Sequence, residues 1–353
     1  MTGDALYMRR CIDLAYGGLG MVAPNPLVGA VVVHEDRIIG EGFHERFGGP
    51  HAEVNAINAV EDKNLLSSSS LYVNLEPCCH FGKTPPCTDM IIRYKVPRVV
   101  AGSKDPSEKI NGKGLELLKQ HGVKVITGVE SELCTDLNKR FFTYHNKHRP
   151  YVILKWAQTP DGYIGVRGMG RYPVSNEHSL ELSRKWRSLE GSIMVGTGTA
   201  AADNPRLTSP AGKNPVRIVV DRKLSLAGNL HLFDGSVKTF VFTEKEKTSS
   251  ENIEYVRTDS SLFNKNNLLP QILYFLYLRE IQSLIVEGGA GLLQSFIDSG
   301  IWDEARVFTG QHKINTVDFS MGIKAPSLGN REPYEKRDLT GDVLSSYFNN
   351  GSL

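Results

Sequence analysis

The sequence has few cysteines and lacks a long apolar run. Its five cysteines among 353 residues are an odd number at low density, which argues against a disulfide framework and favours a reducing cytoplasm. The longest uninterrupted apolar run, Ile272–Leu278, has seven residues, whereas roughly 20 are needed to cross a bilayer. We therefore expect a cytoplasmic protein with no membrane span and no secretion signal.

The sequence also lacks an excess of charge of either sign. Lysine and arginine number 41 and aspartate and glutamate 39, which leaves a net charge of +2. This balance argues against a nucleic-acid backbone as the main partner, although a local basic patch is compatible with it. The chain is 40% apolar and 23% charged, as in ordinary globular proteins, and its length corresponds to about two domains at roughly 150 residues each.

Helix and strand patterns alternate through the first half of the chain. Some segments have apolar residues at helical spacing, others are short β-branched runs, and two neighbouring runs are separated by one turn, as in a hairpin. This rhythm predicts a sheet with parallel strands covered by helices. The expected helices are Ala5–Tyr16, His51–Val60, Gly114–His121 and Glu130–His145, and the expected strands are Gly29–Val33, Ile38–Gly40, Leu71–Leu75, Val99–Gly102 and Val123–Ile126. In the last helix, Leu133, Leu137 and Phe141 are expected to share one apolar face.

A polar, proline-terminated segment, Asn146–Pro150, separates the two halves. We place the domain boundary there, with domains at residues 1–146 and 147–353. A second alternation follows, with no internal repeat of fixed period, so the halves are not duplicates. It consists of strands at Val152–Leu154, Ser192–Val195, Arg217–Val220, Thr239–Thr243 and Ser283–Val286, and of helices at Glu177–Leu189 and Gly288–Ile297. The predicted fold class is two successive α/β domains.

One histidine and two cysteines have the spacing of a catalytic zinc site. His51 opens a helix, Cys78 follows Pro77 after a strand, and Cys87 lies nine positions further on. Three ligands leave the fourth position of zinc open for water, whose pKa the metal lowers toward neutrality. Glu53, two residues after His51, could move a proton from that water to a leaving ammonia. This is the His-x-Glu and Pro-Cys pattern of zinc-dependent base deaminases, with the second cysteine delayed.

Two other interpretations of these residues stay open. The histidine and the cysteine pair could be unrelated, or Cys79 or His80 could supply a fourth ligand and close a structural zinc site. The position of the acid beside the histidine and of Pro-Cys after a strand favours a catalytic zinc. Cys11 and Cys134 lie in helical patterns and are expected to be buried.

Two longer motifs resemble a known family. Residues 51–57 and 75–87, with the Gly-Lys-Thr-Pro-Pro-Cys insertion, are similar to the deaminase half of bifunctional riboflavin-biosynthesis deaminase-reductases, and residues 23–29 match the same family. The resemblance implies a cytidine-deaminase-like three-layer α/β/α domain. It also implies hydrolytic deamination of 2,5-diamino-6-(ribosylamino)-4(3H)-pyrimidinone 5′-phosphate, with one zinc ion per chain.

The same resemblance implies a set of substrate contacts. The positions that match are Asn25, His44, His80, Lys83 and Asp105. An asparagine offers a donor and an acceptor to a base edge, and a lysine offers a point charge to phosphate, although Asn25 between two prolines would otherwise be interpreted as a turn residue. The segment Pro106–Lys109 departs from the family pattern, which leaves the detailed contacts of this loop open.

Two glycine-rich turns mark the second half. Gly196–Thr199 and Glu287–Gly291 each follow a predicted strand, and the second opens a helix whose backbone N–H groups could bind a phosphate. It matches the dinucleotide fingerprint only in part, because Gln294 stands where the third glycine would be. A turn that merely joins strand to helix is the alternative. Two such turns in one domain favour a cofactor that carries phosphate.

The resemblance extends over this half, at residues 154–157, 161–162, 203–205, 216–221 and 286–289. It implies a dihydrofolate-reductase-like domain that uses NADPH to reduce 5-amino-6-(ribosylamino)uracil 5′-phosphate to its ribityl form, in a chain that forms homo-oligomers. Lys155 would be the catalytic group at the reacting sugar. Substrate contacts would come from Arg171, Arg187, Leu207 and Glu287. Cofactor contacts would come from Ala157, Pro173, Thr199, Asp203, Arg222, Gly289, Ala290, Gly291, Leu292, Leu293, Gln294 and Ser295.

One position in this half departs from the family. Pro210 stands where an arginine is usual, and Arg206, Lys213 or Arg171 could take over its phosphate contact. Arg222 could pair with the 2′-phosphate that distinguishes NADPH from NADH, whereas Arg187 by itself would be interpreted as a solvated helix residue. The alternatives to two active halves are a deaminase of another base, nucleotide or RNA, and a reductase-like domain that is inactive or only binds nucleotide.

Overall fold

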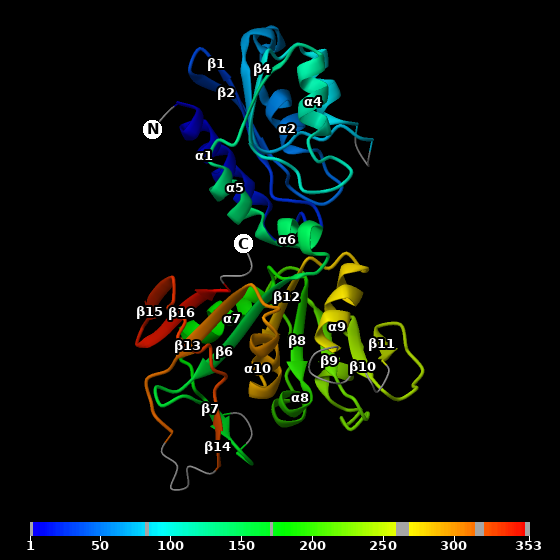
Figure 1. The fold of residues 1–353 in the computed structure, drawn as a ribbon, viewed down its shortest axis with the longest axis vertical. Helices are drawn as coiled ribbons and strands as arrows, with labels where there is room; N and C mark the ends of the chain where they lie inside the picture. Colours follow the sequence, from blue (N-terminus) through cyan, green and yellow to red (C-terminus); the bar gives the residue numbers. More distant parts are fainter. Residues whose placement is uncertain (1–2, 82–84, 170–171, 259–267, 315–320, 350–353) are drawn as a thin grey trace. The chain divides into compact units, whose positions relative to one another are not determined.

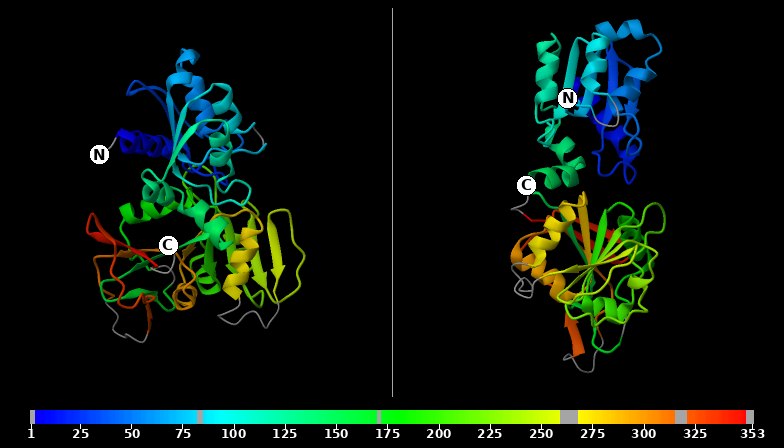
Figure 2. Two further views of the ribbon diagram at one scale, coloured as in Figure 1. Left: turned by 45° about the horizontal axis from the view of Figure 1, so that its top comes forward. Right: turned by 90° about the vertical axis from the view of Figure 1, so that its right-hand side faces the viewer.

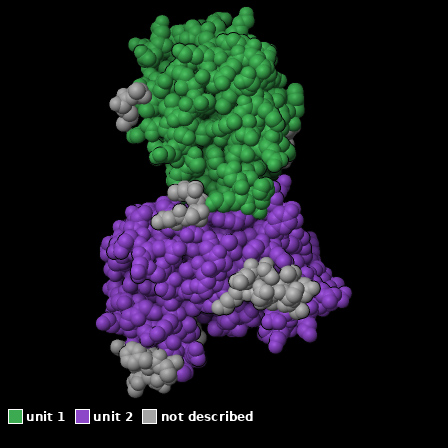
Figure 3. Space-filling model, in the orientation of Figure 1, with its two compact units in different colours: residues 1–148 green, residues 149–353 purple. Residues whose placement is uncertain are grey.

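The computed structural model describes residues 3–81, 85–169, 172–258, 268–314 and 321–349. The chain forms two compact units, residues 1–148 and 149–353, which Figure 3 colours separately. Within the described residues, no helix combines the length and the apolar character needed to cross a membrane.

The N-terminal unit is built on a five-stranded sheet in the order β2-β1-β3-β4-β5. Strands β1 and β2 form the predicted hairpin, β1 also pairs antiparallel with β3, and β3, β4 and β5 run parallel. The strands are β1 Gly29–His34, β2 Arg37–Phe43, β3 Ser70–Leu75, β4 Arg98–Ser103 and β5 Lys124–Thr127, and the helices are α1 Gly3–Ala15, α2 Ala52–Ala59, α3 Cys87–Arg93, α4 Lys113–Gln120, α5 Ser131–Leu137 and α6 Lys139–Lys147.

Helices cover both faces of this sheet, which gives three layers (Figures 1 and 2). Side chains alternate along a strand, so Ala30 and Val32 of β1 pack with α2, α3 and α4, whereas Val31 and Val33 pack with α1 and α5. Helix α2 lies directly on β2 because Gly42 has no side chain there: a Cβ atom at Gly42 would lie 2.5 Å from the backbone nitrogen of Ala56. This close packing holds α2 beside the sheet.

The structure corrects one predicted helix. The expected single helix Glu130–His145 is two helices, α5 and α6, which meet at Asn138. Leu137 and Phe141 are buried as expected, but Leu133 is 46% exposed. The break has a tertiary cause: the Asn138 side chain bonds to the backbone of Leu27, at 2.8 and 2.9 Å, and these bonds hold the helix junction against a segment distant in the sequence.

The C-terminal unit contains a nine-stranded sheet in the order β11-β10-β9-β8-β12-β6-β13-β16-β15. The strands from β11 to β13 are parallel, and β16 and β15 extend the sheet antiparallel. The bounds are β6 Tyr151–Gln158, β8 Ser192–Gly196, β9 Val216–Val220, β10 Thr239–Thr243, β11 Ile253–Arg257, β12 Ser283–Glu287, β13 Glu304–Thr309, β15 Glu335–Leu339 and β16 Asp342–Phe348. A separate pair is formed by β7 Tyr163–Val166 and β14 Gly322–Lys324.

Helices also cover both faces of the second sheet (Figure 1). Residues of α7 Glu177–Arg187 and α8 Thr197–Asp203 pack on one face, and those of α9 Leu268–Tyr277 and α10 Ala290–Ser299 pack on the other. The strands β8 and β12 are neighbours, and the helices that follow them, α8 and α10, lie on opposite faces. In open α/β sheets such a switch point is where ligands bind, at the carboxyl ends of the strands.

Candidate active sites

The three predicted zinc ligands lie together in the N-terminal unit. His51 caps the start of α2, Cys78 follows β3, and Cys87 is the first residue of α3. Their ligand atoms lie within 4.8 Å of one another. His51 Nδ1 is 3.4 Å from Cys78 Sγ and 3.3 Å from Cys87 Sγ. The start of one helix, the end of a strand and the start of a second helix therefore converge on one point.

The chemistry of this cluster fits a catalytic zinc ion. One imidazole and two thiolates are common zinc ligands, and three protein ligands leave one position open. Neither Cys79 nor His80 belongs to the cluster among the residues that the structure describes, so the three ligands stand without the fourth that a closed structural site needs. Hydrogen bonds from Cys87 and His51 lower the pKa of the Cys78 thiol, which favours the thiolate form that binds metal. Cys11 and Cys134 are buried elsewhere, as expected.

Glu53 is placed beside the ligands and does not belong to the cluster. It lies in the first turn of α2 and is 4% exposed. Burial raises the pKa of its carboxyl group to about 7, and the nearby Cys78 adds to this effect. A buried carboxyl group with a pKa near neutrality can take up and release a proton in the working pH range.

Asn25 and His44 are in contact near the zinc cluster. Asn25 Nδ2 lies 3.0 Å from His44 Nε2, and His44 Nδ1 lies 2.9 Å from the backbone oxygen of Pro50. His44 is 3% exposed, and its ring meets that of His51 edge-on at 5.5 Å between centroids. Burial lowers the pKa of His44, which favours its neutral form. The structure thus links Asn25 to His44, and His44 to Pro50, which precedes the zinc ligand His51.

Two asparagines that the sequence analysis missed hold the segment after Asn25. Asn74 on β3 donates to the backbone oxygen of Leu27 at 3.0 Å and accepts from the backbone N–H of Gly29 at 2.8 Å. Asn138 accepts from the N–H of Leu27 at 2.8 Å and donates to its oxygen at 2.9 Å. Both side chains are buried. The only signal for them in the sequence is a polar residue within an apolar strand pattern, at Asn74.

Asp105 lies in a loop that another buried carboxylate organises. Asp105 is 3% exposed, and burial raises the pKa of its carboxyl group, an effect that bonds from Ser107 and the nearby His80 oppose. Glu76, which the sequence analysis did not single out, accepts from the backbone N–H groups of Asp105 at 3.1 Å, Gly112 at 2.8 Å, Gly114 at 3.0 Å and Leu115 at 3.4 Å. Since Cys78 follows Glu76 by two residues, the same strand end holds this loop and a zinc ligand. Lys83 lies outside the described residues.

A second group of charged residues lies at the carboxyl end of the parallel strands in the C-terminal unit. Glu287 ends β12 and is paired in register with Lys155 on β6. Arg187, at the end of α7, forms a bidentate pair with Glu287, at 2.9 Å from Nε and 2.7 Å from Nη2. Its Nη1 also donates to the backbone oxygen of Thr208 at 3.3 Å. Arg187 is therefore a partly buried ion-pair partner and not a solvated helix residue.

The charge balance of this group is set by two cations around one buried carboxylate. Burial would raise the pKa of Glu287, but the nearby Lys155 and the hydrogen-bonded Arg187 lower it below its usual value. Glu287 therefore stays ionised at neutral pH.

Leu207, the residue before Thr208, is buried with a φ of 53°.

The two glycine-rich turns meet at the switch point between β8 and β12. Gly288 and Gly289 have φ values of 87° and 82°, a conformation that favours glycine. A Cβ atom at Gly289 would lie 3.2 Å from Thr199 Oγ1 and 3.9 Å from Gly196 Cα. Apart from chain neighbours and the backbone of their own helices, no atom of the described residues lies within 4 Å of the Cβ positions of Gly198 and Gly291. We call these two closely approaching turns the glycine cradle. Because the start of α10 lies at the second turn and the Cβ positions of Gly198 and Gly291 are unfilled, the glycine cradle fits a phosphate-bearing cofactor.

The remaining predicted cofactor residues differ in their surroundings. Asp203 is the last residue of α8. Arg222 is exposed and forms an ion pair with Glu244 at 2.5 Å. Pro173 is also exposed and lies in the segment before α7. Leu293 packs in the core of the unit, so its side chain cannot contact a cofactor at the turn. Gln294 binds the backbone N–H of Ser327 at 2.8 Å. Ala157 lies on β6, while Ala290, Gly291, Leu292 and Ser295 belong to α10, and Arg171 lies outside the described residues.

Comparisons with known proteins cover both units. Residues 1–103 match the cytidine and deoxycytidylate deaminase zinc-binding region, and residues 150–310 match the RibD C-terminal domain. The riboflavin biosynthesis protein RibD of Actinobacillus pleuropneumoniae is 40% identical over an alignment of 358 residues, which covers 98% of this chain and 95% of that relative. The RibD protein of Aquifex aeolicus is 40% identical over 312 residues, which cover 86% of each chain.

Solved structures agree over the whole length. A diaminohydroxyphosphoribosylaminopyrimidine deaminase/5-amino-6-(5-phosphoribosylamino)uracil reductase from Thermotoga maritima is 36% identical with a TM-score of 0.86, and the match covers 98% of both chains. A RibD structure from Acinetobacter baumannii is 26% identical with a TM-score of 0.87 over 98% of both chains. These similarities confirm the expected fold class, a cytidine-deaminase-like domain followed by a reductase domain of the dihydrofolate-reductase type.

Proposed function

The chain belongs to the RibD family of bifunctional deaminase-reductases of riboflavin biosynthesis, and from this premise we propose the substrates and cofactors of its two sites. The N-terminal domain, residues 1–146, deaminates 2,5-diamino-6-(ribosylamino)-4(3H)-pyrimidinone 5′-phosphate with one zinc ion. The C-terminal domain, residues 147–353, then uses NADPH to reduce 5-amino-6-(ribosylamino)uracil 5′-phosphate to its ribityl form.

The proposed deaminase activity rests on the three-ligand cluster with Glu53 beside it. His51, Cys78 and Cys87 would hold the ion. When bound there, zinc lowers the pKa of water toward neutrality, so that hydroxide is available at neutral pH. In the hydrolysis, an oxygen–carbon bond forms at the 2-amino carbon of the pyrimidine, and the bond to the amino group breaks. Glu53 receives a proton from the attacking water and delivers one to the amino group, which leaves as ammonia.

Asn25 and His44 orient the pyrimidine. His44 Nδ1 faces a backbone oxygen, which can only accept, so Nδ1 carries the proton and Nε2 accepts from the Asn25 amide. The Asn25 amide oxygen then remains to accept from an N–H group of the base. Asp105 and His80 lie close to each other and bind the ribose phosphate portion together with Lys83.

The proposed reductase activity is supported by the position of the glycine cradle next to the charged residues Lys155, Arg187 and Glu287. NADPH supplies the hydride that reduces C1 of the opened ribose. The N–H groups at the start of α10 and the turn Gly288–Gly289 bind its phosphates, and Thr199 and Asp203 contact it from α8. Lys155 lies beside Glu287 on the neighbouring strand, where its ammonium group can donate to an oxygen of the sugar. Arg187, held by Glu287, binds the substrate.

One experiment tests both halves in the intact chain. Purified protein is given the diaminopyrimidine substrate, and ammonia release and NADPH oxidation are followed separately. We expect both, with ammonia appearing first. Removal of zinc with a chelator should abolish ammonia release but leave NADPH oxidation intact when the uracil substrate is supplied directly. Ammonia without NADPH oxidation would refute the reductase, and NADPH oxidation with the uracil substrate but no ammonia from the diaminopyrimidine would refute the deaminase.

A further inference from the structure

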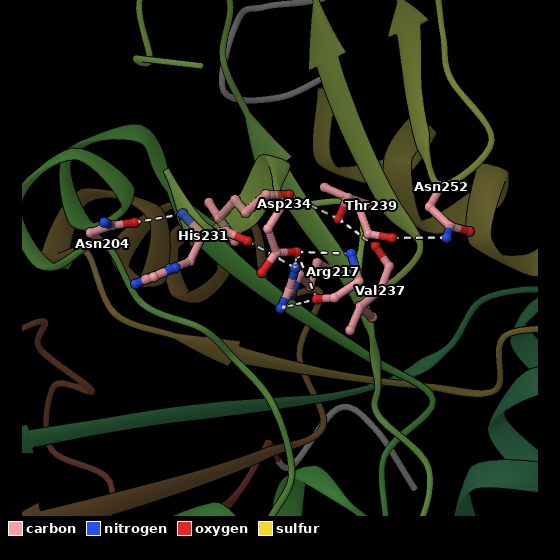
Figure 4. Close-up of polar contacts among 10 residues, drawn as sticks. Asn204, Arg217, His231, Asp234, Val237, Thr239 and Asn252 are labelled. Atoms are coloured by element: carbon pink, nitrogen blue, oxygen red, sulfur yellow. Dashed lines mark hydrogen bonds and ion pairs between the residues drawn. The ribbon is translucent and has the colours of Figure 1, made fainter. Parts of the chain in front are cut away.

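A fully buried arginine organises a loop in the C-terminal unit. Arg217 lies on β9, and its side chain is 1% exposed. Its Nη1 donates to the backbone oxygen of His231 and to Asp234 Oδ1, both at 3.0 Å, and its Nη2 lies 3.4 Å from Ser236 Oγ (Figure 4). Burying a guanidinium is unfavourable unless it is hydrogen-bonded; Nη1 and Nη2 have these acceptors, whereas Nε has none among the described residues. The segment that supplies these acceptors, residues 231–236, is therefore held in place; we call it the anchor segment.

The anchor segment is also tied to β10 and to the residue that precedes β11. Thr239 Oγ1, on β10, donates to the backbone oxygen of Leu232 at 3.2 Å, and Asn252 Nδ2 donates to that of Gly235 at 2.9 Å. Thr239 and Asn252 lie on the same side of Arg217 in Figure 4, opposite to Asn204. The Leu232 side chain is fully buried. The anchor segment is thus held by β9, by β10 and by Asn252.

Asn204 connects the anchor segment to helix α8. The backbone N–H of His231 donates to Asn204 Oδ1 at 2.7 Å, and Figure 4 shows the two residues facing each other beside the Arg217 cluster. Asn204 is the C-cap residue that directly follows α8, in the left-handed conformation with φ 41° and ψ 55°. Its own N–H donates to the backbone oxygen of Ala200 at 3.2 Å. The side chain therefore fixes the carboxyl end of α8 to the anchor segment.

The other end of α8 is held at the glycine cradle. The Thr197 hydroxyl donates to the backbone oxygen of Val220, and Thr199 packs against the turn Gly288–Gly289. Helix α8 has only seven residues, about 10 Å at 1.5 Å per residue. In so short an element, a shift at the carboxyl end moves residues at the amino end as well. Asp203, the last helical residue, is next to Asn204 in the chain.

We propose that Asn204 is a positioning residue of the reductase, which acts by fixing α8 to the anchor segment and so holds Thr199 and Asp203 in place for the cofactor. The inference rests on the proposed function, in which these two residues contact NADPH. It assigns Asn204 no contact of its own with cofactor or substrate. Without the bond to His231, α8 would keep its core packing through Ala200 but lose the contact that fixes its carboxyl end, and NADPH would bind to a less ordered site.

Two substitutions at this position separate the side-chain bond from the backbone conformation. Asn204→Gly keeps the left-handed conformation accessible but removes the acceptor, and Asn204→Asp keeps an acceptor oxygen. Asn252→Ala is the matched control, because it removes a comparable side-chain bond to the same anchor segment without touching α8. The dissociation constant for NADPH is measured by fluorescence titration of the full chain, with kcat and the KM for NADPH. Deaminase activity and the melting temperature report on folding.

We expect Asn204→Gly to raise the dissociation constant and the KM for NADPH about five- to tenfold, as the loss of one hydrogen bond would. Asn204→Asp and Asn252→Ala should stay within about twofold of wild type, and all variants should retain deaminase activity. Equal NADPH affinity in wild type and Asn204→Gly, with or without a lower melting temperature, would refute the positioning role alone. Failure of the wild-type chain to bind NADPH would instead refute the proposed cofactor.

Discussion

The amide nitrogen of Asn25 and Nε2 of His44 lie 3.0 Å apart, and this contact fixes which way the Asn25 amide points. The His44 ring is itself held by its bond to the backbone oxygen of Pro50. The two residues come from different segments, before β1 and after β2, yet act as one unit. The amide oxygen of Asn25 is thereby set apart for a ligand.

Asn25→Ala should lower kcat/KM for deamination about 10- to 100-fold, because a base N–H group would lose its acceptor and His44 would lose its donor. The reductase reaction with the uracil substrate should be unchanged. Asn58→Ala, at an exposed position on α2, is the matched control. Ammonia release under initial-rate conditions checks the prediction, and wild-type kinetics in Asn25→Ala would contradict the assigned role.

Glu53→Gln should abolish ammonia release while leaving zinc bound. The amide has nearly the shape of the carboxylate but cannot transfer the proton, and general acid–base groups contribute typically 10²- to 10⁴-fold to a rate. Metal content measured on the purified variant should remain one zinc per chain, because Glu53 does not belong to the ligand cluster. Loss of zinc together with activity would show instead that Glu53 supports the metal.

Glu287→Gln should lower kcat/KM for the reductase at least tenfold and destabilise the C-terminal unit. The substitution leaves Arg187 and Lys155 without the buried carboxylate between them, and breaking a buried pair is strongly unfavourable. The control is Glu181→Gln, whose ion pair with Lys185 is exposed and should matter little. NADPH oxidation, deaminase activity and thermal unfolding are measured in parallel. An unchanged reductase rate in Glu287→Gln would contradict the prediction.

Asp4→Asn should destabilise the N-terminal unit at neutral pH by about 0.5–1 kcal/mol, a value typical of a partly exposed pair. Arg98 binds both carboxylate oxygens of Asp4, at 2.8 and 2.7 Å, and lowers the pKa of Asp4 below 3.8. Since the folded state prefers the ionised form, this stabilisation is complete above pH 3.8 and is lost as the pH falls through the lower, folded-state pKa.

The difference in stability between wild type and Asp4→Asn should therefore shrink as the pH is lowered from 7 to below 3. Urea unfolding at several pH values measures it. Asp13→Asn, at an exposed position of the same helix, serves as the control. A difference that stays constant down to pH 2 would mean that the Asp4 charge is not its cause.

The zinc site could be predicted from the sequence because its chemistry is local. A histidine, a nearby acid and two cysteines at the right spacing are rare in combination, and each lies at the start of a helix or just after a strand, where the pattern of apolar residues is clear. The same holds for the glycine turns, since each follows a strong strand signal. That the two turns meet was not predicted; it results from the neighbouring positions of the parallel strands β8 and β12.

Other features depend on residues that are distant in the sequence. The break at Asn138 results from bonds to Leu27, 111 positions away, and no periodicity within Glu130–His145 indicates it. Arg217 lies in an ordinary strand pattern, and its burial depends on acceptors from a later loop. The partners of Glu76 are backbone N–H groups. Since these groups do not depend on residue type, no residue in the sequence indicates them. These contacts arise from tertiary packing.

The order of strands in the second sheet has a consequence for synthesis on the ribosome. Its first strand, β6, ends at Gln158 but pairs with β12 and β13, which are complete only at Thr309. At 5–20 residues per second, the ribosome needs about 8–30 s to supply both partners. The first sheet is complete by Thr127. The nascent deaminase half therefore has all its strands, and all three zinc ligands, well before the reductase half can close its sheet.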